Sequence, residues 1–426
     1  MKPRFYFILI LLISHISWAS QPINNATKSI EKIKWQFKTQ GKIFSSPTIY
    51  KNTIFIGSED GYLYAINKKT GHLKWKFKTN GAVHATPKIQ NQTVYFLSYD
   101  GYFYAIHIHT GALKWKFKTN GEFNIAHHST TPKTDTTYYD PWDCYLSSAS
   151  FAKINGSTCV FFGSSDGHVY ALNTNNGQPI WSFNAKGIIH SSPTIHNNKI
   201  FIGNANGVFY AIDATNGKEI WKYKTGEQPG MSGILASAVV HDGKVIFGAK
   251  DAHLYALDEN NGHLKWRYNA GIAWIIGTAI IKNNTIYVGT SDSYLLLAID
   301  AATGVEKEKF NVNGYIFATP TIYKNNIYIG DFTGRIFEVS EQPFSSFSNS
   351  WSTLSRSRLA KDILKNDKID FLFASKGKNL DIPMNSVRTM DDIYSLGSFA
   401  SSPLVEKGIM YIGSADGNLY AFELNK

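Results

Sequence analysis

The sequence predicts an all-β fold: an eight-bladed β-propeller whose blades each contain four antiparallel strands. A short motif of β-branched and aromatic residues around a tight turn recurs eight times, and most copies begin 40 to 45 residues apart. A period near 40 residues with only β-type patterning is typical of a propeller, in which each repeat builds one blade. The copies begin at Gly57, Leu97, Gly163, Gly203, Gly248, Gly289, Gly330 and Gly413.

Each repeat contains the residues for four strands. In the first repeat, 53–57 and 62–66 are runs of β-branched and aromatic residues separated by an Asp-Gly pair, which suits a tight hairpin because both residues tolerate positive φ. A Thr-Gly turn then leads into a run at 73–77. With the preceding stretch 45–49, the repeat supplies the four antiparallel strands of one blade.

A tryptophan recurs in the last strand of most repeats, and Phe310 is interpreted as its replacement in one of them. The tryptophans are Trp35, Trp75, Trp115, Trp181, Trp221 and Trp266. The segments AINKKTGHLKW (65–75) and AIDATNGKEIW (211–221) resemble the docking motif of the pyrroloquinoline-quinone (PQQ) repeat family. That resemblance implies that each tryptophan packs against the neighbouring blade and locks adjacent sheets.

The two ends of the chain complete each other. The last repeat stops at its third strand, 420–424, and no tryptophan strand follows it. The strand at 33–37 precedes the first complete repeat and has no blade of its own. We therefore expect the N-terminal and C-terminal strands to pair and close the ring, which removes an unpaired sheet edge.

The N-terminus resembles an export signal. Lys2 and Arg4 precede an apolar run at 5–13, and small residues follow at the positions read by a signal peptidase, so 1–19 is predicted to be cleaved. The rest, 20–426, is predicted to be a single propeller domain without a transmembrane segment. No Cys stands at the cleavage point to accept a lipid. The expected location is therefore periplasmic or secreted.

Two segments interrupt the repeats, at 122–145 and 341–396. The first has loop composition, and loops on a rigid scaffold often bind partners. The second contains Leu354, Leu359 and Ile363 at helical spacing on a basic background. Such a helix could contact a partner or an anionic surface, or it could cap the propeller with its apolar face.

The two cysteines, Cys144 and Cys159, lie on either side of a predicted strand. An antiparallel pairing places them near opposite ends of two strands, farther apart than the roughly 7 Å between Cα atoms that a disulfide allows. A flexible approach to the first strand leaves the bridge open as an alternative. Adjacent histidines in the first insertion lack the spacing of a specific metal site, so no metal ligands are predicted.

Candidate ligand or partner residues lie just before the first strands, which line the central channel of a propeller. They are Phe44, His84, His190, Trp274 and Phe317. Histidine charge and aromatic stacking at a channel mouth could hold a planar anionic ligand. The alternative is that these side chains simply fill the mouth.

The PQQ repeat also occurs in quinoprotein dehydrogenases of alcohols and sugars, and that resemblance would imply PQQ and Ca²⁺ as cofactors. The sequence lacks the adjacent cysteines of the alcohol-oxidising branch, a haem-binding CxxCH and a recognisable catalytic Asp. No catalytic residue is assigned and no cofactor is expected, because a fold does not imply a function. A PQQ-dependent dehydrogenase remains the alternative function.

In size and blade number the chain is more similar to the BamB-like family. That resemblance implies an exported, non-catalytic scaffold that binds the membrane-embedded machine for assembling outer-membrane β-barrels. The expected partner is an envelope protein, and the expected state is a monomeric propeller. The missing lipid-acceptor Cys and both insertions depart from the family pattern.

The formal net charge is +11, which becomes +9 when Lys2 and Arg4 are removed. Lysines alternate with aromatic residues along the last strand of several repeats, as in Trp75-Lys76-Phe77-Lys78, so they should point outward. They could meet lipopolysaccharide or another anionic glycan, or they could protect an exposed sheet edge from aggregation. No nucleic-acid-binding module is visible in the sequence, and none is expected of an exported chain.

Overall fold

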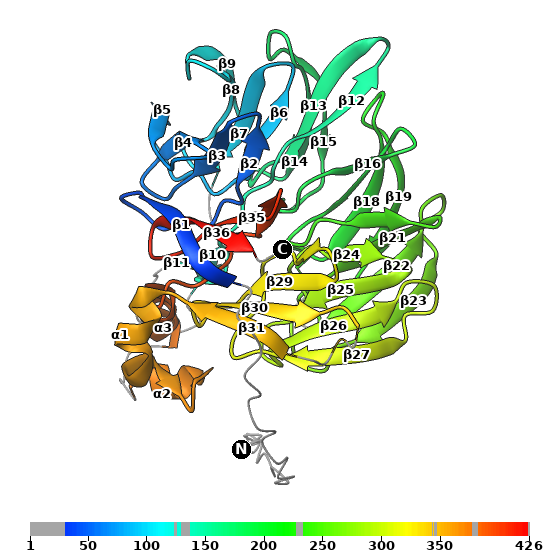
Figure 1. The fold of residues 1–426 in the computed structure, drawn as a ribbon. Coiled ribbons are helices and arrows are strands. Elements are labelled where there is room, and N and C mark those ends of the chain that lie inside the picture. Colours follow the sequence, from blue (N-terminus) through cyan, green and yellow to red (C-terminus); the bar gives the residue numbers. More distant parts are fainter. Residues whose placement is uncertain are drawn as a thin grey trace, which may run out of the picture.

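In the computed structural model, eight four-stranded antiparallel sheets form a ring around a central channel (Figure 1). The structure describes residues 30–122, 126–128, 137–226, 233–342, 344, 347–376 and 382–424. The predicted eight-bladed propeller is confirmed. The predicted signal segment, 1–19, lies outside the described residues.

The blades follow the chain in order. Blade 1 contains β2 (Thr48–Tyr50), β3 (Thr53–Gly57), β4 (Tyr62–Asn67) and β5 (Leu73–Lys78). Blade 2 contains β6 (Lys88–Gln90), β7 (Thr93–Ser98), β8 (Tyr102–His107) and β9 (Leu113–Lys118). Blade 3 contains β12 (Ser150–Ile154), β13 (Ser157–Gly163), β14 (His168–Asn173) and β15 (Pro179–Asn184). Blade 4 contains β16 (Thr194–His196), β17 (Lys199–Gly203), β18 (Val208–Asp213) and β19 (Glu219–Lys224).

The second half repeats the same arrangement. Blade 5 contains β20 (Val239–His241), β21 (Lys244–Gly248), β22 (His253–Asp258) and β23 (Leu264–Asn269). Blade 6 contains β24 (Ile280–Lys282), β25 (Thr285–Gly289), β26 (Leu295–Asp300) and β27 (Glu306–Asn311). Blade 7 contains β28 (Thr321–Tyr323), β29 (Asn326–Gly330), β30 (Arg335–Ser340) and β31 (Phe347–Ser352). Blade 8 contains β34 (Leu404–Glu406), β35 (Ile409–Gly413), β36 (Asn418–Leu424) and β1 (Ile30–Lys38).

The core lies between the blades. In blade 1 the two middle strands, β3 and β4, are buried along nearly their whole length, because each blade is covered on both faces by its neighbours. The outermost strand, β5, alternates exposed lysines with half-buried aromatic residues. This alternation is the one expected from the sequence.

The ring closes between the chain termini, as predicted. Strand β1 pairs with β36 in antiparallel register, with Trp35 opposite Ala421 and Phe37 opposite Leu419. In Figure 1 the blue β1 and the red β36 lie side by side. The N-terminal strand thus supplies the fourth strand of blade 8, and β36 has no unpaired edge.

The tryptophans dock against the next blade, as the repeat family implies. Trp115 of blade 2 lies against the turn glycine Gly177 of blade 3, and its indole N–H donates to the Thr174 carbonyl at 2.9 Å. Gly177 has a φ of +72°, which leaves the face of the turn free of a side chain where the indole lies. The other contacts of this kind pair Trp35 with Gly71, Trp75 with Gly111, Trp181 with Gly217, Trp221 with Gly262 and Trp266 with Gly304.

The interpretation of Phe310 as a docking residue is wrong. The docking tryptophans stand opposite an alanine of the preceding strand, and in blade 6 the residue opposite Ala298 is Glu308. Phe310 stands opposite Leu296, which is the register of Phe77 in blade 1. The nearest aromatic residue is therefore two positions past the docking site, and Glu308 occupies the site itself.

Both insertions lie at one end of the channel. The first contains a short hairpin of β10 (Ala126–His128) and β11 (Thr137–Tyr139). The second contains α1 (Leu354–Ile363), β32 (Leu364–Lys365), β33 (Lys368–Ile369), α2 (Phe371–Ala374) and α3 (Ile382–Ser395). Strand β31 falls inside the range predicted as an insertion, yet it pairs with β30 and completes blade 7. No helix in the described part of the chain is both long and apolar enough to span a bilayer.

Cys144 and Cys159 are both free and buried. They belong to different hydrophobic clusters, one at the channel mouth and one between blades 3 and 4. The structure therefore contains no disulfide between Cys144 and Cys159.

Candidate functional site

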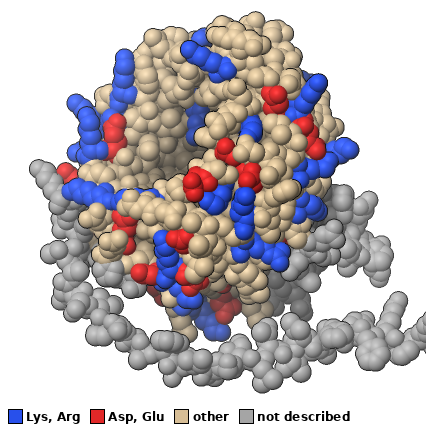
Figure 2. Space-filling model, turned by 90° about the vertical axis from the view of Figure 1, so that its right-hand side faces the viewer, with Lys and Arg blue, Asp and Glu red and all other residues tan. Residues whose placement is uncertain are grey.

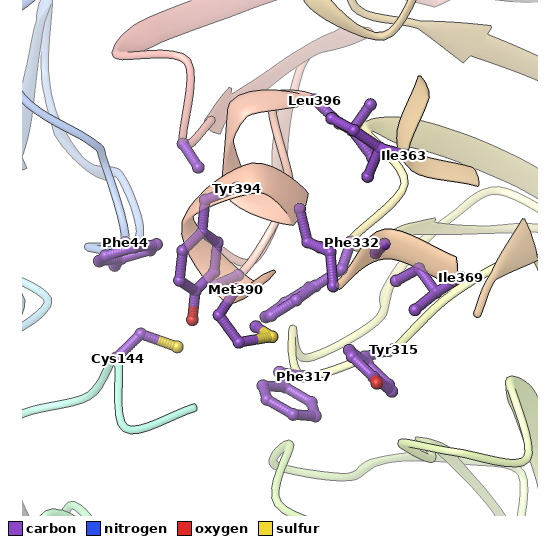
Figure 3. Close-up of a cluster of buried hydrophobic side chains, with 14 of the residues drawn as sticks. Phe44, Cys144, Tyr315, Phe317, Phe332, Ile363, Ile369, Met390, Tyr394 and Leu396 are labelled. Atoms are coloured by element: carbon purple, nitrogen blue, oxygen red, sulfur yellow. The ribbon is translucent and has the colours of Figure 1, made fainter. Parts of the chain in front are cut away.

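The channel mouth beneath the helical insertion is filled by the protein's own side chains. Figure 3 shows Tyr394 and Met390 of α3 pointing toward Phe44 and Phe317, with Cys144 of the first insertion beside them. All five residues are at least nine-tenths buried. The two insertions thus meet over the mouth and close it.

Backbone carbonyls hold this closure together across long sequence separations. The Tyr394 hydroxyl donates to the Pro141 carbonyl at 2.7 Å, which joins α3 to the first insertion. The Tyr145 hydroxyl donates to the Phe317 carbonyl at 2.8 Å, which joins the first insertion to blade 7. A buried hydroxyl needs such a partner, so these bonds also fix the orientation of both rings.

Four of the five candidates from the sequence occupy equivalent positions around this mouth. We call these positions the upper ring, which consists of Phe44, His84, Leu146, His190, Leu235, Ile276, Phe317 and Ala400. The Phe44 ring lies 5.0 Å from His84 and 5.1 Å from Tyr394. In blade 6 the ring position belongs to Ile276, so Trp274 lies two residues outside it.

Trp274 belongs to a neighbouring cleft with a buried ion pair. The Lys250 ammonium lies 4.5 Å from the centre of the Trp274 ring and 2.7 Å from an Asp140 carboxylate oxygen. Both charged side chains are more than nine-tenths buried. The cleft has a volume of about 330 Å³ and is lined by Trp142, Ile272, Trp274, Ser291, Asp292, Tyr315 and Phe317.

His190 takes part in a Ser-His-Asp hydrogen-bond chain. Its Nδ1 lies 2.8 Å from Asp143 Oδ1, and its Nε2 lies 2.8 Å from Ser165 Oγ. This is the order of groups that activates a serine nucleophile in hydrolases. Sequence reasoning had singled out His190 alone, because the three residues come from different blades and an insertion.

The surroundings of the Ser165–His190–Asp143 hydrogen bonds are typical of a buried structural network. The side chains of His190 and Asp143 have no solvent exposure, and Ser165 is 2% exposed. The Ser165 backbone N–H donates to a Glu122 carboxylate oxygen at 2.8 Å, so an anion lies where a hydrolase requires donors for its oxyanion. Burial raises the pKa of Glu122. The network joins the first insertion to blades 3 and 4.

His84 is buried among aromatic rings, and in the part of the chain that the structure describes both of its nitrogens lack a hydrogen-bond partner. Its ring makes edge contacts with Phe44 and Tyr99, each with 5.0 Å between centroids. Burial, opposed by the nearby Asp143 carboxylate, lowers the pKa of His84 to about 4. The imidazole is therefore neutral at pH 7. It faces a cavity of about 100 Å³ inside the channel.

Below this cavity a ring of hydroxyl side chains surrounds the channel axis. We call it the hydroxyl ring, and it consists of Ser46, Thr86, Ser148, Ser192, Ser237, Thr278, Thr319 and Ser402. In seven places the backbone N–H of one member donates to the hydroxyl of the next blade, at 2.9 to 3.3 Å. This ring was not predicted from the sequence. Its signal is the Ser or Thr that recurs before Pro or Ala at the start of each first strand.

The opposite end of the channel widens into a funnel of about 740 Å³. Figure 2 shows a hollow at the centre of the face that it presents. The lower ring of the funnel, two residues beyond the hydroxyl ring in each blade, consists of Thr48, Lys88, Ser150, Thr194, Val239, Ile280, Thr321 and Leu404. Lys88 is the only charged member. Glu406, at the funnel wall, is ion-paired with Lys68.

The residues at the closed mouth do not fit PQQ with Ca²⁺. The planar quinone would need a slot beneath an aromatic ring, and Tyr394, Met390 and Phe44 fill that space. Two acidic groups at the mouth, Asp140 and Asp143, are held by Lys250 and His190, and Asp292 in the neighbouring cleft accepts a hydrogen bond from Ser291 Oγ at 2.6 Å. In the described ranges no three His, Cys, Asp or Glu side chains gather as metal ligands would.

Comparisons with solved structures show the same fold. BamB from Moraxella catarrhalis is similar with a TM-score of 0.62 and 14% identity, over 92% of this chain and 98% of that one. The computationally designed Ika8 protein has a TM-score of 0.64 and 16% identity, over 92% and 100% of the two chains. The quinohemoprotein alcohol dehydrogenase from Comamonas testosteroni has a TM-score of 0.63 and 12% identity, over 92% and 76%.

At these identities the three structures bear on the fold alone. No curated protein sequence matches this chain. A family model does match: it is described as "Outer membrane protein assembly factor BamB" and covers residues 28–141, 146–342 and 250–426. These matches span nearly all of the chain. The chain therefore belongs to the BamB family of PQQ-repeat β-propellers.

Proposed function

We propose that this protein is an exported, non-catalytic scaffold of the cell envelope that binds a protein of the outer-membrane assembly machinery. The observation that carries the proposal is the closed channel mouth, where catalytic members of the fold would need an open site. Tyr394 and Met390 fill it, and the Asp140 and Asp143 carboxylates beside it are held in buried pairs. Membership of the BamB family supports the kind of partner.

The helical insertion offers a contact surface for that partner. Leu372 and Phe373 of α2 are 80% and 41% exposed, and Leu354 of α1 is 69% exposed. Lys361, Asp362 and Lys376 flank a groove of about 450 Å³ beside α2. Adjacent exposed apolar side chains inside a charged rim are typical of a protein-binding patch.

Affinity capture tests the scaffold function. The tagged protein is cross-linked in intact cells and recovered from solubilised envelopes, and the expected result is stoichiometric recovery of the membrane-embedded β-barrel assembly machine. Leu372→Ser with Phe373→Ser should reduce recovery. The matched control, Leu73→Ser with Leu113→Ser, removes two exposed leucines from the outer strands of blades 1 and 2 and should leave recovery unchanged. Absence of the machine from repeated captures contradicts the proposal.

A titration separates this function from the dehydrogenase alternative. The purified protein is mixed with micromolar PQQ and Ca²⁺, and binding and dye reduction with alcohols or sugars are measured. The scaffold function predicts neither, because the closed mouth leaves no slot for the quinone. Tight binding with dye reduction would establish the dehydrogenase instead.

Export is the remaining part of the proposal. Lys2, Arg4 and the apolar run at 5–13 support cleavage after Ala19. Sequencing the N-terminus of the protein from a periplasmic fraction should show a chain that begins at Ser20. A cytoplasmic protein that retains Met1 would contradict export. Binding of lipopolysaccharide or another anionic glycan by the outer lysines stays a secondary prediction.

A further inference from the structure

We infer that the open half of the channel binds a small oxyanion, held by the Lys88 ammonium and the hydroxyl ring, with His84 facing it from the closed half. This site is separate from the sealed mouth and from the exposed helical patch. The ligand class is a phosphate or a carboxylate, either as a free solute or as the end group of a larger molecule that enters through the funnel.

The hydroxyl ring is a set of hydrogen-bond donors directed at one axis. In the seven linked places each hydroxyl oxygen accepts a backbone N–H from the neighbouring blade, as Ser148 Oγ does from Thr86 at 2.9 Å. Among the described residues, the structure records no acceptor for the hydroxyl proton of any member of the ring. A hydroxyl whose oxygen already accepts a bond and whose proton is unused is ready to donate to an anion.

Lys88 supplies the charge. Its equivalents in other blades include Thr48, Ser150 and Thr194, whose hydroxyls donate to a carbonyl of the next blade at 2.5 to 2.6 Å. The Lys88 side chain has no hydroxyl to make that contact. In the described parts of the chain its ammonium group makes neither an ion pair nor a hydrogen bond. Burial lowers the pKa of its ammonium group, and an anion beside it would favour the charged form.

The same wall of the channel carries a third polar group. His84 and Thr86 line the cavity inside the channel, and Thr86 and Lys88 line the funnel, so three side chains of blade 2 follow the same wall. His84 is 8% exposed, and neither of its nitrogens has a hydrogen-bond partner among the described residues. Its neutral ring has one N–H to donate toward that cavity. Blade 2 thus presents three potential donors in a column.

The remaining charges near the funnel do not compete for the anion. Among the described residues, Glu406 is the only acidic one that lines the funnel, and it is ion-paired with Lys68. The rest of the lining is Ser, Thr, Pro and aliphatic side chains. An anion in the funnel would therefore meet one uncompensated cation and a ring of hydroxyl donors. A cation would meet Lys88 and no free carboxylate.

Isothermal titration calorimetry with inorganic phosphate on the full-length exported protein tests the site. Saturable binding of one phosphate per chain is expected. Lys88→Met should weaken it by about tenfold or more, the effect typical of losing one charge-assisted hydrogen bond. The matched control is Lys116→Met, which removes a lysine from the exposed outermost strand of the same blade and should change the affinity by less than about twofold.

Two further measurements make the assignment specific. Thr86→Val keeps the shape of the side chain but removes one ring hydroxyl, and it should also weaken phosphate binding. An anion bound beside Lys88 should raise the pKa of its ammonium group, so binding at alkaline pH should take up protons, and the measured enthalpy should vary with the ionisation enthalpy of the buffer. Lys88→Met should abolish that variation while Lys116→Met retains it.

The competing outcomes are distinct. No saturable binding at millimolar phosphate, or equal weakening in Lys88→Met and Lys116→Met, would overturn the inference. If a hexose phosphate and acetate bind as well as phosphate, the site accepts the end group of a larger molecule. If only inorganic phosphate binds, the site takes a free solute. Capture of the assembly machine by Lys88→Met should remain unchanged, which separates this site from the scaffold function.

Discussion

The indole of Trp115 in blade 2 lies directly on Gly177 in blade 3, so close that a Cβ added to Gly177 would stand 2.5 Å from the Trp115 Cε3 atom. The same contact recurs at six blade boundaries, and in five of them the indole N–H also donates to a carbonyl of the next blade. Blade stacking therefore depends on a glycine as much as on a tryptophan.

Gly177→Ala should destabilise the protein through this contact. Gly156 in the same blade also has positive φ, +81°, but nothing lies within 4 Å of its added Cβ. Gly156→Ala should cost only the backbone strain, about 1 to 2 kcal/mol. Gly177→Ala should cost about 1 to 3 kcal/mol more, because the indole must move. Urea unfolding of both variants measures the difference, and equal losses would show that the contact does not matter.

Deleting β1, residues 30–38, should open the ring. Strand β36 would keep its pairing with β35 but lose its pairing with β1 along its whole length, and it would present an unpaired edge to other molecules. The expected result is a sharply lower melting temperature together with aggregation. Gln36→Ala, an exposed position on the same strand, serves as the control and should melt like the parent protein. An unchanged melt of the deletion would refute the closure.

Replacing one member of the buried Lys250–Asp140 pair should destabilise the protein far more than replacing both. Lys250→Met removes the ammonium group that lies 2.7 Å from the Asp140 carboxylate and should cost about 3 to 5 kcal/mol. Adding Asp140→Asn should recover most of that loss, because the carboxylate charge is then removed as well. The exposed pair of Lys222 and Glu219 gives the control: Lys222→Met should cost less than about 1 kcal/mol. Denaturant midpoints provide the comparison, and equal costs would contradict it.

Stability should fall at acidic pH because of His84. Its pKa is about 4 in the folded protein and about 6.5 when unfolded, so the unfolded state binds more protons between these values. The contribution is therefore present in full above pH 6.5 and declines as the pH falls toward 4, by up to about 3 kcal/mol. His84→Phe should flatten this part of the stability profile, whereas His72→Phe, at an exposed position, should not. Parallel profiles for all three proteins would disprove the assignment.

Much of the architecture was predictable because local sequence patterns that repeat along the chain specify it. The motif period, the Thr-Gly turns and the docking tryptophans each involve residues of one blade or of adjacent blades. The error at Phe310 arose where the pattern weakened: Glu308 carries no aromatic signal, and only the strand register shows that it occupies the docking site. Strand β31 was missed for the same reason, since no turn glycine precedes it in blade 7.

The candidate site was predictable only in part. Phe44, His84, His190 and Phe317 do gather at one mouth of the channel, because equivalent positions of a ring face the same axis. Their surroundings were not predictable. The mouth is closed by bonds such as Tyr394 to Pro141, which joins residues 253 positions apart. A single sequence contains no periodic signal for a contact of that kind.

The sequence by itself determined the eight-bladed ring, its closure and the tryptophan docking, since strand period and turn chemistry act over a few residues. Only the tertiary structure decided that the insertions seal one mouth, that Ser165, His190 and Asp143 form a buried network, and that the Lys88 ammonium lies on the open side of the hydroxyl ring with no ion pair among the described residues. The physical reason is that burial and the pairing of charges depend on which distant segments pack against each other. The radial arrangement of the blades decides which segments those are.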